Sequence, residues 1–198
     1  MKILLYSYII TAATAATIAS DCSSTQSSAI EYGNQACVKL ANAAAEAAES
    51  GSEETFQEFF KDATQSTRSQ VAENYRKVAD ECSSRSGDSI ITSYCTNRRN
   101  YCQGGLLAYT EWSYQGADRT ASTYYCPSYF DLAPSSTGCG EQSQGSNTLH
   151  ETTHAAFGTK DIAYGLGNVK SLSNSQALEN ADTYTFYAIG SSILSRAS

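Results

Sequence analysis

The chain has 198 residues, of which 41% are hydrophobic and 17% are charged, so it is long enough for one globular domain and short for two. Acidic residues outnumber basic ones by 20 to 13, which gives a net charge of -7 at pH 7. No basic cluster exceeds the pair Arg98–Arg99, and this excludes the electrostatic footprint typical of a protein that binds nucleic acid.

The first residues have the pattern of a secretory signal. An early lysine precedes an apolar run from Ile3, and small residues follow that run. The run becomes rich in Thr and Ala before it reaches the roughly 20 apolar residues that a membrane-spanning helix needs. We therefore predict a signal peptide over residues 1–20, cleaved around Ala19 or Ser20. The mature domain, residues 21–198, is expected to be secreted to the extracellular space and not to bind membranes.

The first third of this domain has helical periodicity. Residues 28–50 are rich in Ala, Glu, Lys and Leu, with small and apolar residues along one face, and Gly51 is expected to end this helix. Residues 53–61 predict a short amphipathic helix, and residues 67–82 carry apolar side chains at a spacing of 3.6 residues. These segments predict packed helices with no chemistry of their own.

Seven cysteines suit an exported protein, because thiols pair in an oxidising compartment. None of them forms a C-x-x-C pair, which argues against a zinc knuckle or a thioredoxin-type site. Cys37 lies early in its helix and Cys82 at the end of another, each on an apolar face. If the two helices run antiparallel, these positions meet and a Cys37–Cys82 disulfide can form. The odd count leaves at least one cysteine unpaired or intermolecular.

The middle of the chain changes character. Between residues 89 and 130, short runs such as SIITSY and LLAYTEW are rich in Ile, Thr, Tyr and Trp and predict a small β-sheet. A loop over residues 135–146 leads to Asn147 or Thr148 as the expected N-cap of the next helix. A final helix is expected over residues 175–194. The pattern predicts an α+β fold that is mainly helical.

The stretch LHETTH contains both histidines of the chain. His150 and His154 are four residues apart, so they project from the same face of a helix. In an H-E-x-x-H motif two such histidines bind Zn²⁺, while the glutamate after the first one, here Glu151, acts on the water that attacks the substrate. The motif predicts one zinc ion per chain.

A catalytic zinc site needs a third protein ligand and keeps a fourth position for water. Asp161 is one candidate, because Gly158 allows the backbone to leave the helix and to return a carboxylate to the metal. Glu179 is the other, since a thermolysin-like arrangement takes its ligand from the region of the last helix. A metzincin pattern fits less well, because its glycine and its last ligand would each be displaced by one residue. The residues alone leave Asp161 and Glu179 open.

The combination of HETTH with GTKDIAYG resembles the aspzincin signature, H-E-x-x-H followed by G-T-x-D-x-x-Y-G, of the deuterolysin family of fungal zinc endopeptidases. Other blocks resemble deuterolysin segments in the same order, namely ANAAAEAAESGSEETFQEFFK, TRSQVAENYRKVA, LAYT and ALENADTYTFYA. The resemblance implies a zincin-like metalloprotease domain with an HExxH active-site helix. It implies a zinc metalloendopeptidase that hydrolyses protein or peptide substrates, and we expect a monomer.

The resemblance also implies the roles of individual residues. It makes His150, His154 and Asp161 the zinc ligands. Glu151 becomes the general base, and Tyr164 the residue that stabilises the transition state. Without the motif, Tyr164 would be read as one more packing tyrosine among fourteen.

Substrate preference is less well defined by this resemblance. Asp182 corresponds to an acidic position near the S1′ pocket of lysine-specific relatives. Thr185 stands where those relatives carry a companion acid, so strict lysine specificity is not expected. A mild preference for basic substrates stays open, as does a role for Asp182 on the helix surface.

The family pattern also implies two disulfides. By that pattern Cys22 pairs with Cys95 and Cys102 with Cys126. Cys139 is then left without its usual partner, because the final cysteine of the family is missing from the end of this chain.

Three departures from the family's sequence pattern support an alternative function, that of a protein that is not an enzyme. The loop between HETTH and GTKD is shorter than in typical deuterolysins, deuterolysin-like sequence begins at Asp21 with no propeptide before it, and one cysteine is lost. The alternative is a secreted binding or effector protein that keeps the aspzincin fold without turnover. Against it, every residue that the chemistry requires is present.

Overall fold

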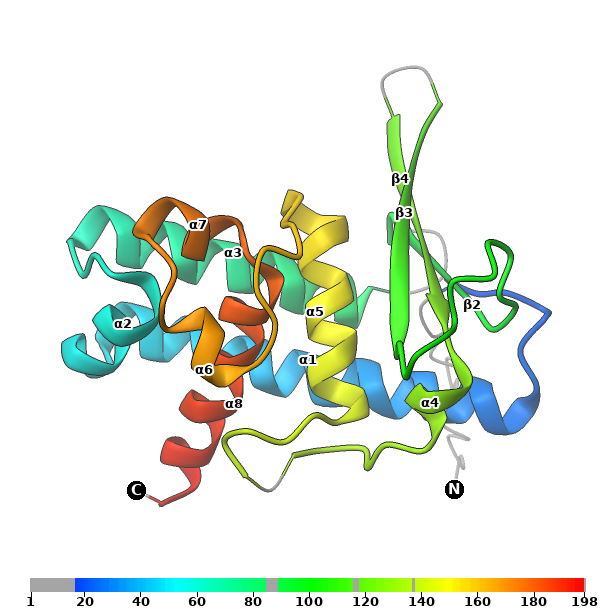
Figure 1. Ribbon diagram of the computed structural model, residues 1–198, viewed down its shortest axis with the longest axis horizontal. Coiled ribbons are helices and arrows are strands. Elements are labelled where there is room, and N and C mark those ends of the chain that lie inside the picture. The colour runs from blue at the N-terminus through cyan, green and yellow to red at the C-terminus, as the bar shows by residue number, and fades with distance from the viewer. Residues whose placement is uncertain (1–16, 85–88, 116–117, 137, 198) are drawn as a thin grey trace, which may run out of the picture.

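A computed structural model describes residues 17–84, 89–115, 118–136 and 138–197. Most of the elements are helices, and they form a body beside which a small sheet stands (Figure 1). The expected α+β, mainly helical fold is confirmed. Most of the expected signal peptide, residues 1–16, lies outside the described residues. Within the described part, no helix is both long and apolar enough to cross a membrane.

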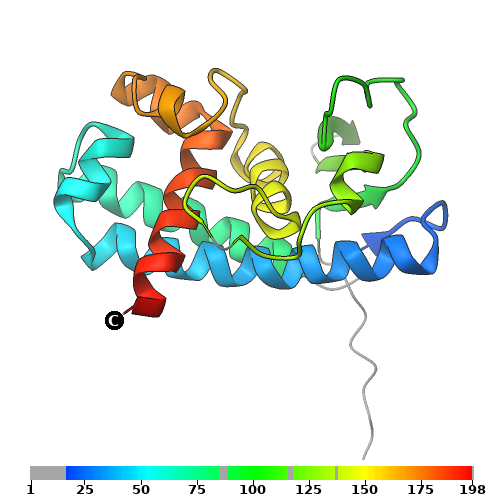
Figure 2. The ribbon, with the colours of Figure 1, turned by 60° about the horizontal axis from the view of Figure 1, so that its bottom comes forward.

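Helix α1 (Ser24–Ser50) is the longest helix and packs against helices α3, α5 and α8. Its N-terminus is closed by a capping box, in which the Ser23 side chain accepts from the backbone N–H of Gln26 and the Gln26 side chain accepts from the N–H of Ser23. The helix starts four residues earlier than expected and ends, as expected, at Gly51. Figure 2 shows α1 extending beneath helix α5 and the sheet, with the end of α8 crossing it.

Helices α2 (Glu53–Phe60) and α3 (Gln65–Ser83) close with α1 and α8 (Ala181–Ala197) around an aromatic core. The rings of this core meet mostly edge to face and are fully or almost fully buried: Phe56, Phe60, Tyr75, Tyr184 and Tyr187. Such large rings each bury a large apolar area, which stabilises a body built from many alanines.

The sheet has the strand order β1-β2-β4-β3. Strand β2 (Ile91–Tyr94) runs parallel to both β1 (Thr17–Ile18) and β4 (Asp118–Tyr125), whereas β3 (Ala108–Gln115) pairs with β4 antiparallel. The expected strands in SIITSY and LLAYTEW correspond to β2 and β3. Strand β3 lies at one edge of the described sheet and faces helix α5, as Figure 1 shows.

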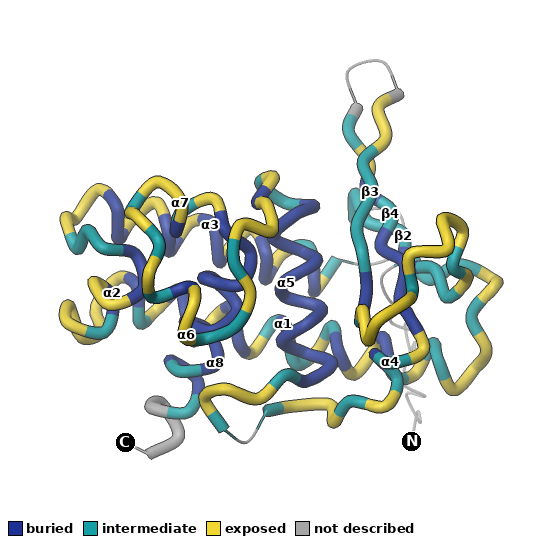
Figure 3. Tube along the Cα trace, viewed as in Figure 1, coloured by how far each residue is buried: buried dark blue, intermediate teal, exposed yellow. Residues whose placement is uncertain are grey.

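Helix α5 (Gln144–Phe157) lies between the sheet and the other helices, after the short helix α4 (Pro127–Phe130), and it is buried along most of its length (Figure 3). The expected N-cap at Asn147 or Thr148 is wrong. Ser143 caps the helix, because its side chain accepts from the N–H of Ser146 while the Ser146 side chain accepts from the N–H of Ser143.

The expected single final helix is also wrong. It is divided into α7 (Asn174–Glu179), which follows the short α6 (Leu166–Val169), and α8. The division falls at Asn180, whose Oδ1 accepts from the N–H groups of Ile162 and Ala163, each at 2.9 Å. Asn180 therefore serves the loop before α6 instead of continuing a helix.

The three disulfides are those expected from geometry and from the family pattern: Cys22–Cys95, Cys37–Cys82 and Cys102–Cys126. Cys37–Cys82 joins α1 to α3, and the other two tie the ends of the sheet. Cys139 is a free, exposed cysteine.

Candidate metal centre

Helix α5 brings three residues of the HETTH motif to the wall of a cleft. His150 and His154 lie one turn apart with their ring centroids 4.9 Å from each other. Both histidines and Glu151 are buried, with exposed fractions of 9% or less. Their placement follows from the helix itself, since residues at i and i+4 share a face.

Asp161 returns to the two histidines after a reversal of the chain. Gly158 ends α5 in the left-handed conformation, with φ of 81°, which glycine adopts without a steric penalty. The segment after it is held against the start of α8, since the N–H of Lys160 donates to the Glu179 carbonyl and the N–H of Ala181 to the Lys160 carbonyl. These bonds fix the backbone just before Asp161, and the bond from the N–H of Ile162 to Asn180 fixes it just after, so the short loop still reaches the histidines.

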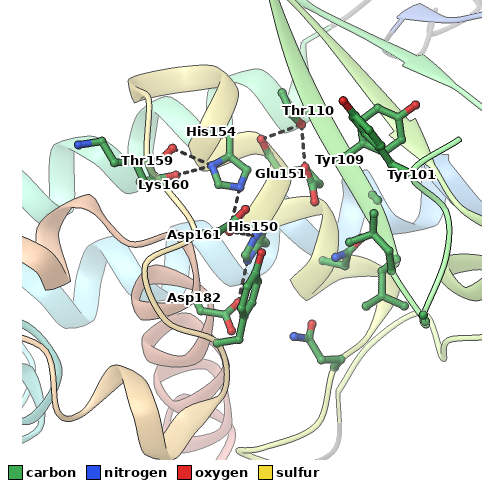
Figure 4. A pocket seen from close by; sticks show the side chains of 18 of the residues that line it. Tyr101, Tyr109, Thr110, His150, Glu151, His154, Thr159, Lys160, Asp161 and Asp182 are labelled. Atoms are coloured by element: carbon green, nitrogen blue, oxygen red, sulfur yellow. Dashed lines mark hydrogen bonds and ion pairs between the residues drawn. The ribbon is translucent and has the colours of Figure 1, made fainter. Parts of the chain in front are cut away.

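The distances in this cluster fit a tetrahedral ion. Asp161 Oδ1 lies 3.0 Å from His150 Nε2 and 3.3 Å from His154 Nε2 (Figure 4). Zinc with bonds of about 2.0–2.1 Å in tetrahedral geometry needs ligand atoms roughly 3.3 Å apart. The two distances to the carboxylate oxygen are therefore close to those that Zn²⁺ requires, and all three candidate ligand atoms, of types that zinc prefers, lie within 4.8 Å of one another.

The other nitrogen of each imidazole is held by a second partner. His150 Nδ1 donates to Asp182 Oδ1 at 2.7 Å, and His154 Nδ1 donates to the Thr159 carbonyl at 2.8 Å. Partners of this kind fix the tautomer, so that Nε2 presents its lone pair to a metal.

Asp182 is therefore not on the helix surface, so the surface role that the sequence left open is wrong. It is 2% exposed, and its second oxygen accepts from the N–H of Gly165 at 2.8 Å. The surface assignment failed because a carboxylate in a helical segment usually faces water, whereas here His150 and Gly165 both supply donors to it.

Interactions between the histidines and the carboxylates of this cluster shift their pKa values. Burial disfavours the protonated form of His150 most, but its hydrogen bonds to Asp161 and Asp182 outweigh burial and raise its pKa to about 10 in the metal-free protein. Burial opposes the charged form of Asp161 as well, yet the two histidines hold its pKa well below the usual range. Asp161 is thus a carboxylate at any ordinary pH.

Glu151 and Tyr164 lie on two sides of this cluster. The carboxylate of Glu151 accepts from the Thr110 hydroxyl at 2.8 Å. Tyr164 is 57% exposed, so it is not a buried packing tyrosine, and its ring lies parallel to the His150 imidazole with centroids 6.3 Å apart. Partial burial and the charge of Asp161 raise the pKa of Tyr164, so its hydroxyl stays protonated and can donate.

Glu179, the other candidate for the third ligand, lies elsewhere. Its carboxylate accepts from Lys160 Nζ at 2.8 Å, and the side chain is more than half exposed. The cluster of groups able to hold a metal in the described residues contains Asp161 and not Glu179. The geometry therefore favours the ligand that the resemblance implies.

The cluster opens into a cleft of about 770 Å³ between α5, β3 and the loops around residues 103–107 and 159–164. Trp112 of β3 lines this cleft, and the guanidinium of Arg119 lies over its ring. Arg119 also donates to the carbonyls of His154 and Ala155 at the end of α5. Sequence reasoning missed roles for Thr110, Thr159 and Arg119. Thr110 had a signal in the LAYT block and Thr159 in the G-T-x-D part of the signature, whereas Arg119 had none.

Comparison with known proteins agrees with this geometry. The model of the deuterolysin metalloprotease (M35) family matches residues 7–195. The chain is 42% identical over 172 residues to a neutral protease 2 homolog from Aspergillus flavus, with 85% of this chain and 58% of the relative covered. It is 42% identical to neutral protease 2 from Aspergillus oryzae, with 85% and 47% covered, and 44% identical to penicillolysin from Penicillium citrinum, with 81% and 45% covered.

The chain spans about half the length of the curated relatives it matches. Within that span the match includes the HETTH helix and the return loop that carries Asp161. The chain belongs to the deuterolysin metalloprotease (M35) family.

Proposed function

We propose that this chain is a secreted zinc-dependent endopeptidase that hydrolyses peptide bonds in proteins. The observation that carries the proposal is the convergence of His150 Nε2, His154 Nε2 and Asp161 Oδ1 at the wall of an open cleft. The names of the relatives, neutral protease and penicillolysin, and the deuterolysin family support the same activity. One Zn²⁺ per chain is the proposed cofactor.

The residues around the cluster have complementary roles in this proposal. When bound, zinc lowers the pKa of a water molecule to about 7 and polarises the substrate carbonyl. Glu151 accepts the proton of the attacking water and passes it to the leaving amine. Tyr164 donates its hydroxyl proton as a hydrogen bond to the oxygen on which negative charge develops, a contribution on the order of 3 kcal/mol.

The proposed substrates are proteins or peptides, with a preference for basic side chains. The chain as a whole carries a charge of -7, which stays negative when one Zn²⁺ is bound, and the carboxylates of Glu151 and Asp182 line the cleft. Such a field attracts cationic peptides and raises their rate of association. Matched peptides that carry Lys or Glu beside the cleaved bond would test this preference, with a higher kcat/KM expected for Lys.

The proposed location is extracellular and the proposed state is monomeric. Three disulfides suit an oxidising compartment, and the residues at the start of the chain have the signal pattern described above. Expression with the native N-terminus, followed by assay of the medium and by light scattering of the purified protein, would test both points.

The experiment that tests the activity uses the purified chain, loaded with zinc, and casein as substrate. We expect cleavage that o-phenanthroline abolishes and added zinc restores. Glu151→Gln should bind one zinc per chain and lose about 100-fold to 10,000-fold of the activity, because only the proton acceptor is removed. Full activity in this variant would remove Glu151 from its role. A zinc-loaded parent without any cleavage would favour the binding or effector protein instead.

A further inference from the structure

A polar contact outside the metal cluster joins the edge strand of the sheet to helix α5. Thr110 of β3 lies with its Oγ1 2.8 Å from Glu151 Oε2 and 3.0 Å from Thr123 Oγ1 (Figure 4). The Glu151 carbonyl is a weaker second neighbour at 3.5 Å. Among the residues that the structure describes, Thr110 alone hydrogen-bonds to the Glu151 carboxylate.

The chemistry of the three groups fixes the direction of these hydrogen bonds. An ionised carboxylate only accepts, so the Thr110 hydroxyl donates its one proton to Glu151. The Thr110 oxygen is then left to accept, and Thr123, its partner across the β3–β4 ladder, donates to it. Both threonines are β-branched and lie in strands, which restricts their rotamers. The hydroxyl of Thr110 is thus held in one orientation.

We infer that Thr110 is a positioning residue for the general base. Thr110 binds Oε2 of Glu151 from the sheet side, which leaves Oε1 to take the proton of the attacking water. Glu151 is 4% exposed, so little solvent competes for Oε2. The inference rests on the function proposed above. It also gives the LAYT block a role, since Thr110 is its last residue.

The kinetic test compares two substitutions at one position. Thr110→Val keeps the shape of the side chain and removes the hydroxyl, whereas Thr110→Ser keeps the hydroxyl. We expect Thr110→Val to lower kcat about tenfold or more, with KM and zinc content unchanged, because the base is misplaced and substrate binding is not. Thr110→Ser should restore most of that loss. Thr120→Val, an exposed site on β4, is the matched control and should behave like the parent.

A second readout does not depend on the metal or on activity. In the metal-free protein, the thermal stabilities of Thr110→Val, Glu151→Ala and the double variant form a cycle. If the hydrogen bond joins the two residues, the double variant loses less stability than the sum of the single losses. Additive losses would contradict the contact, and a rise in KM shared by the Val and Ser variants would show a merely structural role.

The outcomes separate this inference from the function on which it rests. A parent protein that cleaves no peptide overturns the proposed function, and the positioning role falls with it. An active parent whose Thr110→Val variant keeps the full kcat overturns the role of Thr110 alone.

Discussion

Asp182 contacts two parts of the candidate site with its two oxygens. One accepts from His150 Nδ1 and the other from the N–H of Gly165, the residue after Tyr164. A single buried carboxylate therefore orients a proposed zinc ligand and fixes the backbone beside the proposed oxyanion donor. Its position 32 residues along the chain from His150 shows why local patterns could not reveal this role.

Asp182→Asn tests the first contact. The amide keeps the size of the side chain but carries no negative charge, and it cannot accept from both His150 and Gly165. We expect zinc affinity to fall by about 10-fold to 100-fold, measured by competition with a chelator. Asp80→Asn, at an exposed position of α3, is the control for the change of charge. Unchanged zinc affinity in Asp182→Asn would show that this contact does not support the ligand.

The raised pKa of His150 predicts a pH dependence of zinc binding. With a folded pKa of about 10, against about 6.5 when unfolded, the imidazole of the metal-free protein is protonated at pH 7. This protonation stabilises the metal-free fold fully below pH about 6.5, and the stabilisation is lost as the pH rises through about 10. A metal ligand must be neutral, so zinc has to displace this proton.

Zinc binding at pH 7 should therefore release a proton, and affinity should increase from pH 6 to pH 8. Calorimetric titration in two buffers with different heats of ionisation would count the protons. Binding heats that are equal in the two buffers would mean that His150 is already neutral before zinc arrives.

At the scale of elements, periodicity and caps predicted most of the fold. The stripes of small and apolar residues predicted α1, α2 and α3, because each of these helices buries one face. Two errors remain: the N-cap of α5 was misplaced by a few residues, because a local capping box at Ser143 starts that helix, and the final helix was predicted undivided. Asn180 ends α7 because the loop before α6 needs its amide oxygen, and no local pattern signals that need. The site was predictable from HETTH and the return loop, whereas Thr110 joined it only through the sheet.

The contact between α5 and α1 yields a prediction about stability. Gly145 of α5 lies against Ala36 of α1, and a Cβ at position 145 would overlap the Ala36 side chain. Gly145→Ala should therefore lower the free energy of unfolding by about 1–3 kcal/mol, despite the better helix propensity of alanine. Chemical denaturation would measure the change. Gly140→Ala, where a Cβ meets nothing within 4 Å, should have little effect, and equal stability of the two variants would argue against this close packing.

At the scale of the whole molecule, the sheet is completed by residues near the start of the chain. Thr17 and Ile18 form β1 and pair with Thr92 and Ser93 of β2. Cleavage of a signal peptide at Ala19 or Ser20 would remove this strand and leave the outer side of β2 without its partner. An unpaired strand edge is a template for association with other chains.

This pairing of β1 with β2 favours cleavage before Thr17 over the site around Ala19 or Ser20 that the signal pattern predicts, so we expect the secreted protein to begin at Thr17 or at an earlier residue. N-terminal sequencing of protein recovered from the medium would give the position directly. A first residue at Ser20 or Asp21 would show that the mature sheet lacks β1.

The position of Trp112 allows ligand binding in the cleft to be followed by fluorescence in solution. It is the only tryptophan in the chain, and it forms part of one wall of the cleft, beneath the Arg119 guanidinium. The indole emission of the protein therefore comes from a single side chain, which lines the same cleft as the proposed zinc ligands. Its intensity and wavelength should report the arrival of an inhibitor or a peptide in real time, without any added label.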